Sequence, residues 1–161
     1  MTLFASLANS QVTSAKLQAS GLTCALCAKS IFTNLSTLAF VDSVDTDLNA
    51  SAFLIKFKSN KDVDPQMLRK KVEDAGFFIS DLEFQMQFNN QPVVNDGVVN
   101  SSGSSYQFKG FKSTTLNGLI KVQLIDKAFL SAKEFKKISA DHRSSTNQVG
   151  NSNIFSVRVI K

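Results

Sequence analysis

Tryptophan is absent from this chain of 161 residues, and histidine and tyrosine occur once each. Acid–base catalysis relies most often on histidine, so one residue, His142, leaves little for such a scheme. The sequence also lacks a glycine-rich phosphate loop and any Ser-His-Asp arrangement that could activate a nucleophile. We therefore predict that the chain is not an enzyme, and we interpret His142, in a polar segment, as a surface residue.

Long hydrophobic runs are absent as well. No stretch approaches the roughly 18 apolar residues of a membrane-spanning helix, so no transmembrane segment is expected. The first residues resemble the end of a secretory signal, with a short apolar segment followed by small residues, although the basic start and the full apolar run are missing. We predict that residues 1–11 are a signal remnant or a frayed N-terminus, and that the protein is exported to the periplasm or secreted. A cytoplasmic location is the alternative.

The charges are unevenly distributed along the chain. Residues 1–90 hold eight basic and nine acidic residues, a net charge of −1, whereas residues 91–161 hold ten and four, a net charge of +6. This asymmetry suggests two units with different surfaces. The basic residues are scattered rather than clustered in runs, so we do not expect nucleic-acid binding. The 14 phenylalanines are interpreted as core residues.

The segment 12–90 shows the periodicities of six short elements. Strands are predicted at 14–20, 41–48, 52–57 and 77–88, and helices from Ala25 to Leu38 and from Pro65 to Gly76. The first helix is predicted with Thr23 as its N-cap, and the second with Asp64 as its N-cap and Pro65 at its first position. The apolar face of the first helix is predicted to hold Leu26, Ile31, Leu35 and Leu38. The order β-α-β-β-α-β predicts a ferredoxin-like domain of the α+β class.

The composition changes after residue 90. Residues 91–105 are rich in Asn, Ser and Gly, and we predict a linker there. Residues 106–161 are predicted to form a small β-rich domain of unknown type with one helix at 131–139. In that helix Ser131 and Glu134 have the spacing of a capping box.

Cys24 and Cys27 are the two cysteines of the chain, and they lie three residues apart. This spacing occurs in metal sites and in redox motifs. Tetrahedral zinc usually requires four ligands, whereas two thiolates suffice for a soft ion such as Cu(I). Their predicted position at a helix N-terminus favours the thiolate, which is the form that binds metal. From the residues alone, a metal site, a disulfide and a redox-active dithiol all remain open.

The segment around the cysteines resembles a known family. Gly-Leu-Thr-Cys-Ala-Leu-Cys at 21–27 is similar to the Gly-Met-Thr-Cys-x-x-Cys motif of heavy-metal-associated domains, which occur in copper chaperones and in copper-transporting P-type ATPases. The likeness continues at 41–49 and at 72–77 and spans about 14–88. It implies a βαββαβ fold that holds Cu(I) between Cys24 and Cys27. Two positions depart from the family pattern: Leu22 replaces the usual Met, and Phe77 stands where Tyr or Lys is common.

The function predicted from these features is binding of a soft metal ion, most simply Cu(I), by a carrier, chaperone or sensor. Other soft ions fit the same pair of cysteines. The expected partner besides the metal is a metal-transporting or efflux protein. The alternative is a non-catalytic interaction module whose cysteines form a disulfide or a redox-active dithiol.

Overall fold

The structure, a computed structural model, describes residues 10–141 and 154–161. His142 and the first nine residues of the predicted signal remnant therefore lie outside the described residues. The last two residues of that remnant are part of the fold, because Ser10 is buried and Gln11 begins the first strand. The hydroxyl of Ser10 donates a hydrogen bond to the carbonyl oxygen of Asn100 at 2.9 Å.

Eight strands form a single sheet in the order β2-β3-β1-β4-β7-β8-β6-β5. The strands are β1 (Gln11–Ser20), β2 (Val41–Asp47), β3 (Ala52–Phe57), β4 (Phe78–Val93), β5 (Val98–Ser101), β6 (Ser104–Phe108), β7 (Thr114–Leu124) and β8 (Ile154–Ile160). The helices are α1 (Ala25–Ser36), α2 (Pro65–Asp74), α3 (Ala132–Asp141) and the short 3-10 helix η1 (Lys127–Phe129). The predicted α+β class is confirmed.

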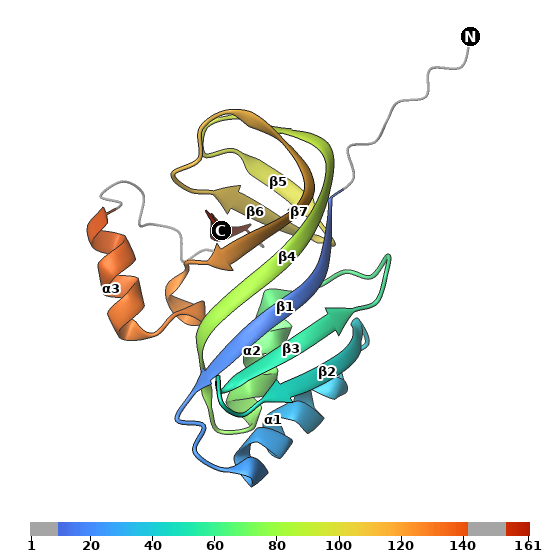
Figure 1. Cartoon of the computed structure of the whole chain (residues 1–161), viewed down its shortest axis with the longest axis vertical. Helices are drawn as coiled ribbons and strands as arrows, with labels where there is room; N and C mark the ends of the chain where they lie inside the picture. The colour runs from blue at the N-terminus through green and yellow to red at the C-terminus, as the bar shows by residue number, and fades with distance from the viewer. Residues whose placement is uncertain (1–9, 142–153) are drawn as a thin grey trace.

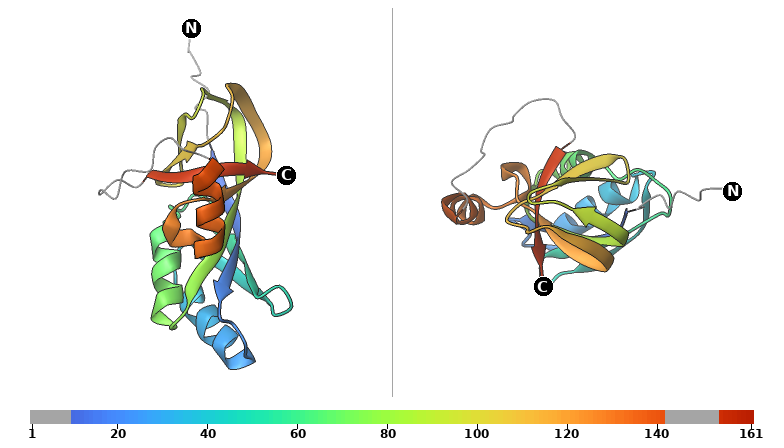
Figure 2. Two further views of the ribbon diagram at one scale, coloured as in Figure 1. Left: turned by 90° about the vertical axis from the view of Figure 1, so that its left-hand side faces the viewer. Right: turned by 90° about the horizontal axis from the view of Figure 1, so that it is seen from above.

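The first half of the chain has the predicted β-α-β-β-α-β order. Strand β1 pairs antiparallel with both β3 and β4, and β3 pairs with β2. Helices α1 and α2 lie together on one face of these strands (Figures 1 and 2). Helix α2 begins as predicted, because Pro65 occupies its first turn and Asp64 Oδ1 accepts a hydrogen bond from the backbone N–H of Gln66 at 2.8 Å.

The face of α1 differs from the prediction at one residue. Ile31 and Leu35 are fully buried, but Leu26 is 79% exposed. Ile31 is five positions after Leu26, which places the two side chains about 140° apart around a helix of 3.6 residues per turn. Ala28 instead occupies the buried position of the first turn. Leu26 is therefore free to contact solvent or a partner beside the cysteines.

Most of residues 91–105 lie in strands rather than in a linker. Strand β4 continues to Val93, and β5 and β6 form an antiparallel hairpin whose turn is Ser102-Gly103. Both turn residues have positive φ, 47° and 78°, a conformation that Gly103 adopts without steric cost. The turn contacts the first half, because the Ser102 carbonyl oxygen accepts a hydrogen bond from the Val63 N–H at 2.8 Å.

A single hydrophobic cluster extends through both halves of the chain. Rings at centroid distances of 5.8–6.1 Å form a continuous path through it. In order, the path contains Phe40, Phe57, Phe84, Tyr106, Phe155 and Phe129. Of the 13 phenylalanines among the described residues, eight are buried, which confirms their main role as core residues. The two halves thus share one core.

The independent folding of residues 12–90 stays a prediction. This fragment retains every strand and helix of the βαββαβ unit, so we expect it to fold. It loses β7, which pairs with β4, and the aromatic neighbours of Phe84 and Phe88. We expect its free energy of unfolding to fall by more than about 3 kcal/mol, because several large apolar side chains lose their cover and burying each one contributes roughly 1.5–3 kcal/mol. Dispersed NMR amide signals with a lower denaturation midpoint would support this, and an insoluble or molten fragment would contradict it.

The second half is β-rich with one α-helix in its described part, as predicted. The backbone N–H of Glu134 donates to Ser131 Oγ at 3.3 Å, so Ser131 caps α3. Helix α3 packs through a small apolar cluster separate from the main core. The predicted helix is therefore confirmed, including its cap.

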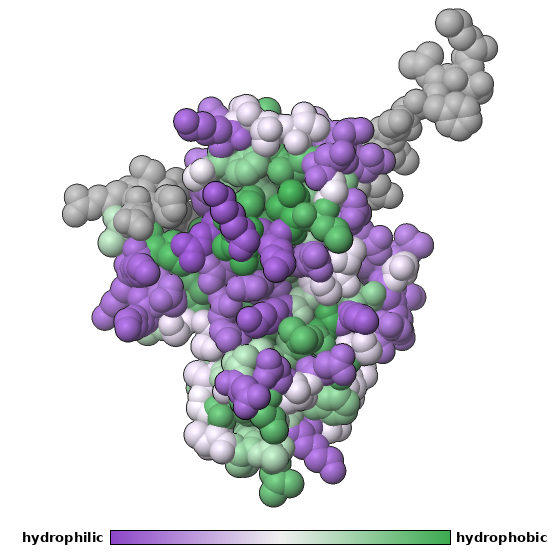
Figure 3. Space-filling model, in the orientation of Figure 1, coloured by the Kyte–Doolittle hydropathy of each residue, from purple (hydrophilic) through white to green (hydrophobic). Residues whose placement is uncertain are grey.

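A row of polar side chains crosses the sheet face opposite α1 and α2. Lys16, Glu83, Gln123 and Arg158 occupy register-matched positions on β1, β4, β7 and β8. Arg158 Nε donates to Gln123 Oε1 at 2.6 Å, and Gln123 Nε2 donates to Asp81. Figure 3 shows hydrophilic residues across the middle of this face.

Partial burial, followed by repulsion from Asp81, raises the pKa of Glu83. A carboxyl whose pKa is higher in the folded state contributes stability at low pH that is lost as the pH rises through the folded pKa. We therefore expect Glu83→Gln to stabilise the protein at neutral pH by less than about 1 kcal/mol, because solvent screens this site. Urea denaturation at neutral pH and near pH 4 should show that the gain disappears in acid. A variant less stable than the parent at neutral pH would contradict this.

Candidate metal centre

Cys24 is the last residue of the loop that connects β1 to α1. Gly21 follows β1 with φ +76°, a conformation that favours glycine. Cys24 then has extended backbone angles and precedes the first helical residue, Ala25. Its Sγ accepts a hydrogen bond from the backbone N–H of Cys27 at 3.1 Å. The N-cap of α1 is therefore Cys24, and the prediction of Thr23 was wrong by one residue.

Cys24 and Cys27 are joined by a disulfide, with their Cα atoms 5.3 Å apart. Cys24 is exposed and Cys27 is half-buried. The structure thus brings the two predicted site residues together in their oxidised form. Because the pair is accessible, a thiol reductant can reach it, and reduction would leave two thiols side by side at the start of the helix.

The electrostatic surroundings of the pair favour anionic sulfur. The first turn of α1 carries no acidic residue, and the free N–H groups and the dipole of a helix N-terminus stabilise negative charge. Lys29 is exposed on the same helix, two residues after Cys27. Reduced cysteines at this position therefore have a raised thiolate fraction.

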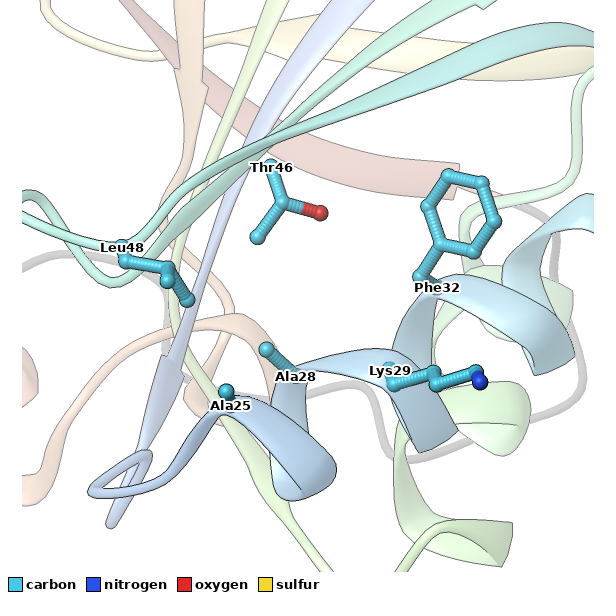
Figure 4. Close-up of a pocket in the computed structure, with 6 residues that line it drawn as sticks. All are labelled: Ala25, Ala28, Lys29, Phe32, Thr46 and Leu48. Carbon is cyan, nitrogen blue, oxygen red and sulfur yellow. The ribbon is translucent and has the colours of Figure 1, made fainter.

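An open groove borders the cysteine loop. Figure 4 shows Ala25, Ala28, Lys29 and Phe32 of α1 facing Thr46 and Leu48 at the end of β2. The groove has a volume of about 290 Å³ and is mostly apolar, with a single amine. Sequence patterns did not indicate it, since Leu48 and Phe32 come together only when the hairpin packs on the helix.

Two positions that depart from the family pattern pack inward. Leu22 and Phe77 are partly buried and contact the main hydrophobic cluster. Leu22 therefore occupies the inward position expected for it beside the metal loop. Phe77 contributes an apolar surface there, and its side chain has no group that could donate a hydrogen bond.

Within the described residues, no group of three or more His, Cys, Asp and Glu side chains lies close enough together to hold a metal ion. No helix in the described parts of the chain is long and apolar enough to cross a membrane. The candidate centre is therefore built from the two cysteines of the α1 loop.

Comparison with known families gives a match in the first half of the chain. Residues 16–78 match the profile of the heavy-metal-associated domain. Over these residues the chain is similar to heavy-metal-associated domains. The match includes the cysteine loop, both helices of the βαββαβ unit and the first residue of β4, and it supports a metal-binding role for the domain. The strands after β4 lie outside it.

Solved structures similar to this domain include the N-terminal domain of PacS from Synechocystis PCC6803, with 27% identity over 41% of this chain and 91% of that one and a TM-score of 0.36. The copper transporter domain Ccc2a from yeast has 25% identity, coverages of 42% and 90% and a TM-score of 0.37. The copper-binding domain of HMA7, a P-type ATPase, has 22% identity, coverages of 48% and 93% and a TM-score of 0.37. A search of curated protein sequences gave no match.

Proposed function

We propose that the heavy-metal-associated domain binds one Cu(I) ion between the sulfur atoms of Cys24 and Cys27, as a metal carrier, chaperone or sensor. The observation that carries this proposal is the position of the cysteine pair at the exposed N-terminus of α1 in a domain of this family. The protein acts as a binding module and not as an enzyme. Other soft ions suit the same sulfur pair, with Cu(I) preferred because two thiolates can complete its coordination.

Reduction must precede metal binding, because a disulfide has no thiolate to donate. The Cys24–Cys27 bond takes up two electrons and two protons from two molecules of a small thiol, which leave as their own disulfide. The two cysteine thiols then lose their protons as Cu(I) binds, so affinity rises with pH until both are deprotonated. The helix N-terminus supports this step by stabilising the anionic sulfurs.

The proposed protein partner is a metal-transporting or efflux protein that exchanges the ion at this loop. The exposed side chain of Leu26 lies between the two cysteines in sequence, and the apolar groove beside them offers further contact area. We place the protein in an exported compartment, where a disulfide between Cys24 and Cys27 is able to persist.

A second candidate function is an interaction module in which the cysteines remain a disulfide or cycle as a redox dithiol. The observed Cys24–Cys27 bond favours this candidate. Metal analysis separates the two functions. After purification of the full chain under reducing conditions with added Cu(I), the carrier predicts one copper per chain, whereas the interaction module predicts copper at background levels.

Bound metal should protect the pair from oxidation. In the Cu(I)-loaded protein both sulfurs are ligands, so little free thiolate is available to form the disulfide, and we expect oxidation to slow by at least tenfold relative to the reduced apo protein. Mass spectrometry after mild oxidant and alkylation of free thiols measures the fraction oxidised. Equal oxidation rates with and without Cu(I) would mean that these two sulfurs do not hold the metal.

A further inference from the structure

Helix α3 is attached to the body of the protein along one face. Phe135 and Ile138 of the helix pack against Ile125 and Leu130 in a cluster separate from the main core. Figures 1 and 2 show that the helix stands at the margin of the molecule, beside the sheet rather than across it. Its opposite face is therefore turned to solvent.

That outward face is basic. Lys133, Lys136 and Lys137 follow the i, i+3, i+4 spacing that places side chains on one face of a helix, and all three are exposed. Lys127 of η1 precedes the helix and is exposed as well. We call Lys133, Lys136 and Lys137 the α3 lysine face. It belongs to the half of the chain that carries the net charge of +6.

The three lysines of the α3 lysine face outnumber the acidic residues of the helix, which are Glu134 and Asp141. Like charges at i, i+3 and i, i+4 destabilise a helix by a few tenths of a kcal/mol per pair. Among the described residues, the ion pairs are Arg69–Glu73 and Lys70–Asp74, both on α2. Glu134, three residues before Lys137, offsets part of this repulsion, and an external anionic surface facing the exposed lysines would offset the remainder.

We propose that the α3 lysine face docks onto a bilayer surface that carries anionic phospholipids. A straight, exposed helix face at the edge of the molecule can lie against a flat surface, and lysine ammonium groups interact with such a surface as separate point charges. Nucleic-acid surfaces usually add arginine and stacking aromatics. This face has neither, because its residues are lysines and the aromatic side chain of α3, Phe135, packs inward.

The test is co-sedimentation of the full-length protein with phosphatidylcholine vesicles, with and without phosphatidylserine. We expect binding only to the anionic vesicles, and we expect it to disappear at high salt because the charges are exposed. The combined variant Lys133→Gln, Lys136→Gln, Lys137→Gln should lower the partition coefficient on the order of a hundredfold, since each lysine near an anionic surface contributes about fivefold. Replacing the same three residues with arginine should restore binding.

A matched control removes three exposed lysines elsewhere, through Lys56→Gln, Lys58→Gln and Lys61→Gln. This control changes the net charge equally and should retain most of the binding. Three results would overturn the proposal. They are absence of wild-type binding to anionic vesicles, equal losses in the two glutamine variants, and binding of duplex DNA through the α3 lysine face without vesicle binding.

Discussion

Replacing Cys24 or Cys27 by serine is expected to abolish tight Cu(I) binding. Each substitution removes one of the two thiolates proposed to hold the ion, and a hydroxyl is a poor ligand for a soft metal. Replacing a residue that hydrogen-bonds to a metal ligand typically lowers metal affinity 10–100-fold. Removing a ligand itself should therefore lower the affinity by more than about a hundredfold. The measurement is competition for Cu(I) against a chelator, with the full chain held reduced under anaerobic conditions.

The Cys24→Ser variant should keep its fold, which makes this result interpretable. Cys24 caps α1 by accepting the Cys27 N–H at Sγ, and serine is one of the preferred N-cap residues. Leu26→Ala is the matched control, because Leu26 lies between the cysteines and is 79% exposed. Its affinity for Cu(I) should change little. Unchanged affinity in the double variant Cys24→Ser, Cys27→Ser would refute the assignment of the site.

Replacing Phe84 by alanine is expected to lower the free energy of unfolding by about 3–5 kcal/mol. Phe84 is 1% exposed, and its ring contacts Phe57 of the first half and Tyr106 of the second at centroid distances of 6.0 and 6.1 Å. The cavity would therefore weaken the core that the two halves share. Chemical denaturation followed by far-UV circular dichroism would measure the loss as a lower midpoint.

The matched control for this substitution lies on the same strand. Phe78 begins β4 and is 67% exposed, so Phe78→Ala should cost less than about 1 kcal/mol. Because the core is continuous, we also expect Phe84→Ala to lower the stability of both halves together in a single transition. Two transitions, with only one of them shifted, would show that the halves unfold independently.

The first half of the fold could be predicted from the sequence because its local signals agree with one another. The alternation of Leu82, Phe84, Met86 and Phe88 matches a strand with one buried face, and all four side chains are at most 1% exposed. Asp64-Pro65 specified the start of α2 through capping chemistry that acts within a few residues. Such local patterns predict strands and helix starts from neighbouring residues alone, without knowledge of contacts between distant parts of the chain.

The second half was harder to predict because its pairing is non-local. Strand β4 pairs with β7, which comes after the β5–β6 hairpin, so that Phe84 lies opposite Val122. Strand β6 pairs in parallel with β8. Residues 91–105 contain the Asn, Ser and Gly of a linker, yet the same residue types form the tight Ser102-Gly103 turn. Composition alone does not distinguish a turn inside a sheet from a connection between domains.

The candidate site followed from the spacing of Cys24 and Cys27 and from a family resemblance, which the match at residues 16–78 supports. The redox state of the pair could not be predicted, because it depends on the compartment as well as on the chain. The exposure of Leu26 and the groove beside α1 also depended on packing, since they arise where the end of β2 meets the helix.

X-ray absorption spectroscopy at the copper edge tests the central claim most directly. The sample is the reduced full chain loaded with one equivalent of Cu(I). The comparison is the double variant Cys24→Ser, Cys27→Ser, prepared in the same way. Binding between Cys24 and Cys27 predicts a first coordination shell of sulfur that is lost in the double variant. A shell of nitrogen or oxygen ligands, or a sulfur shell that persists in the double variant, would contradict it.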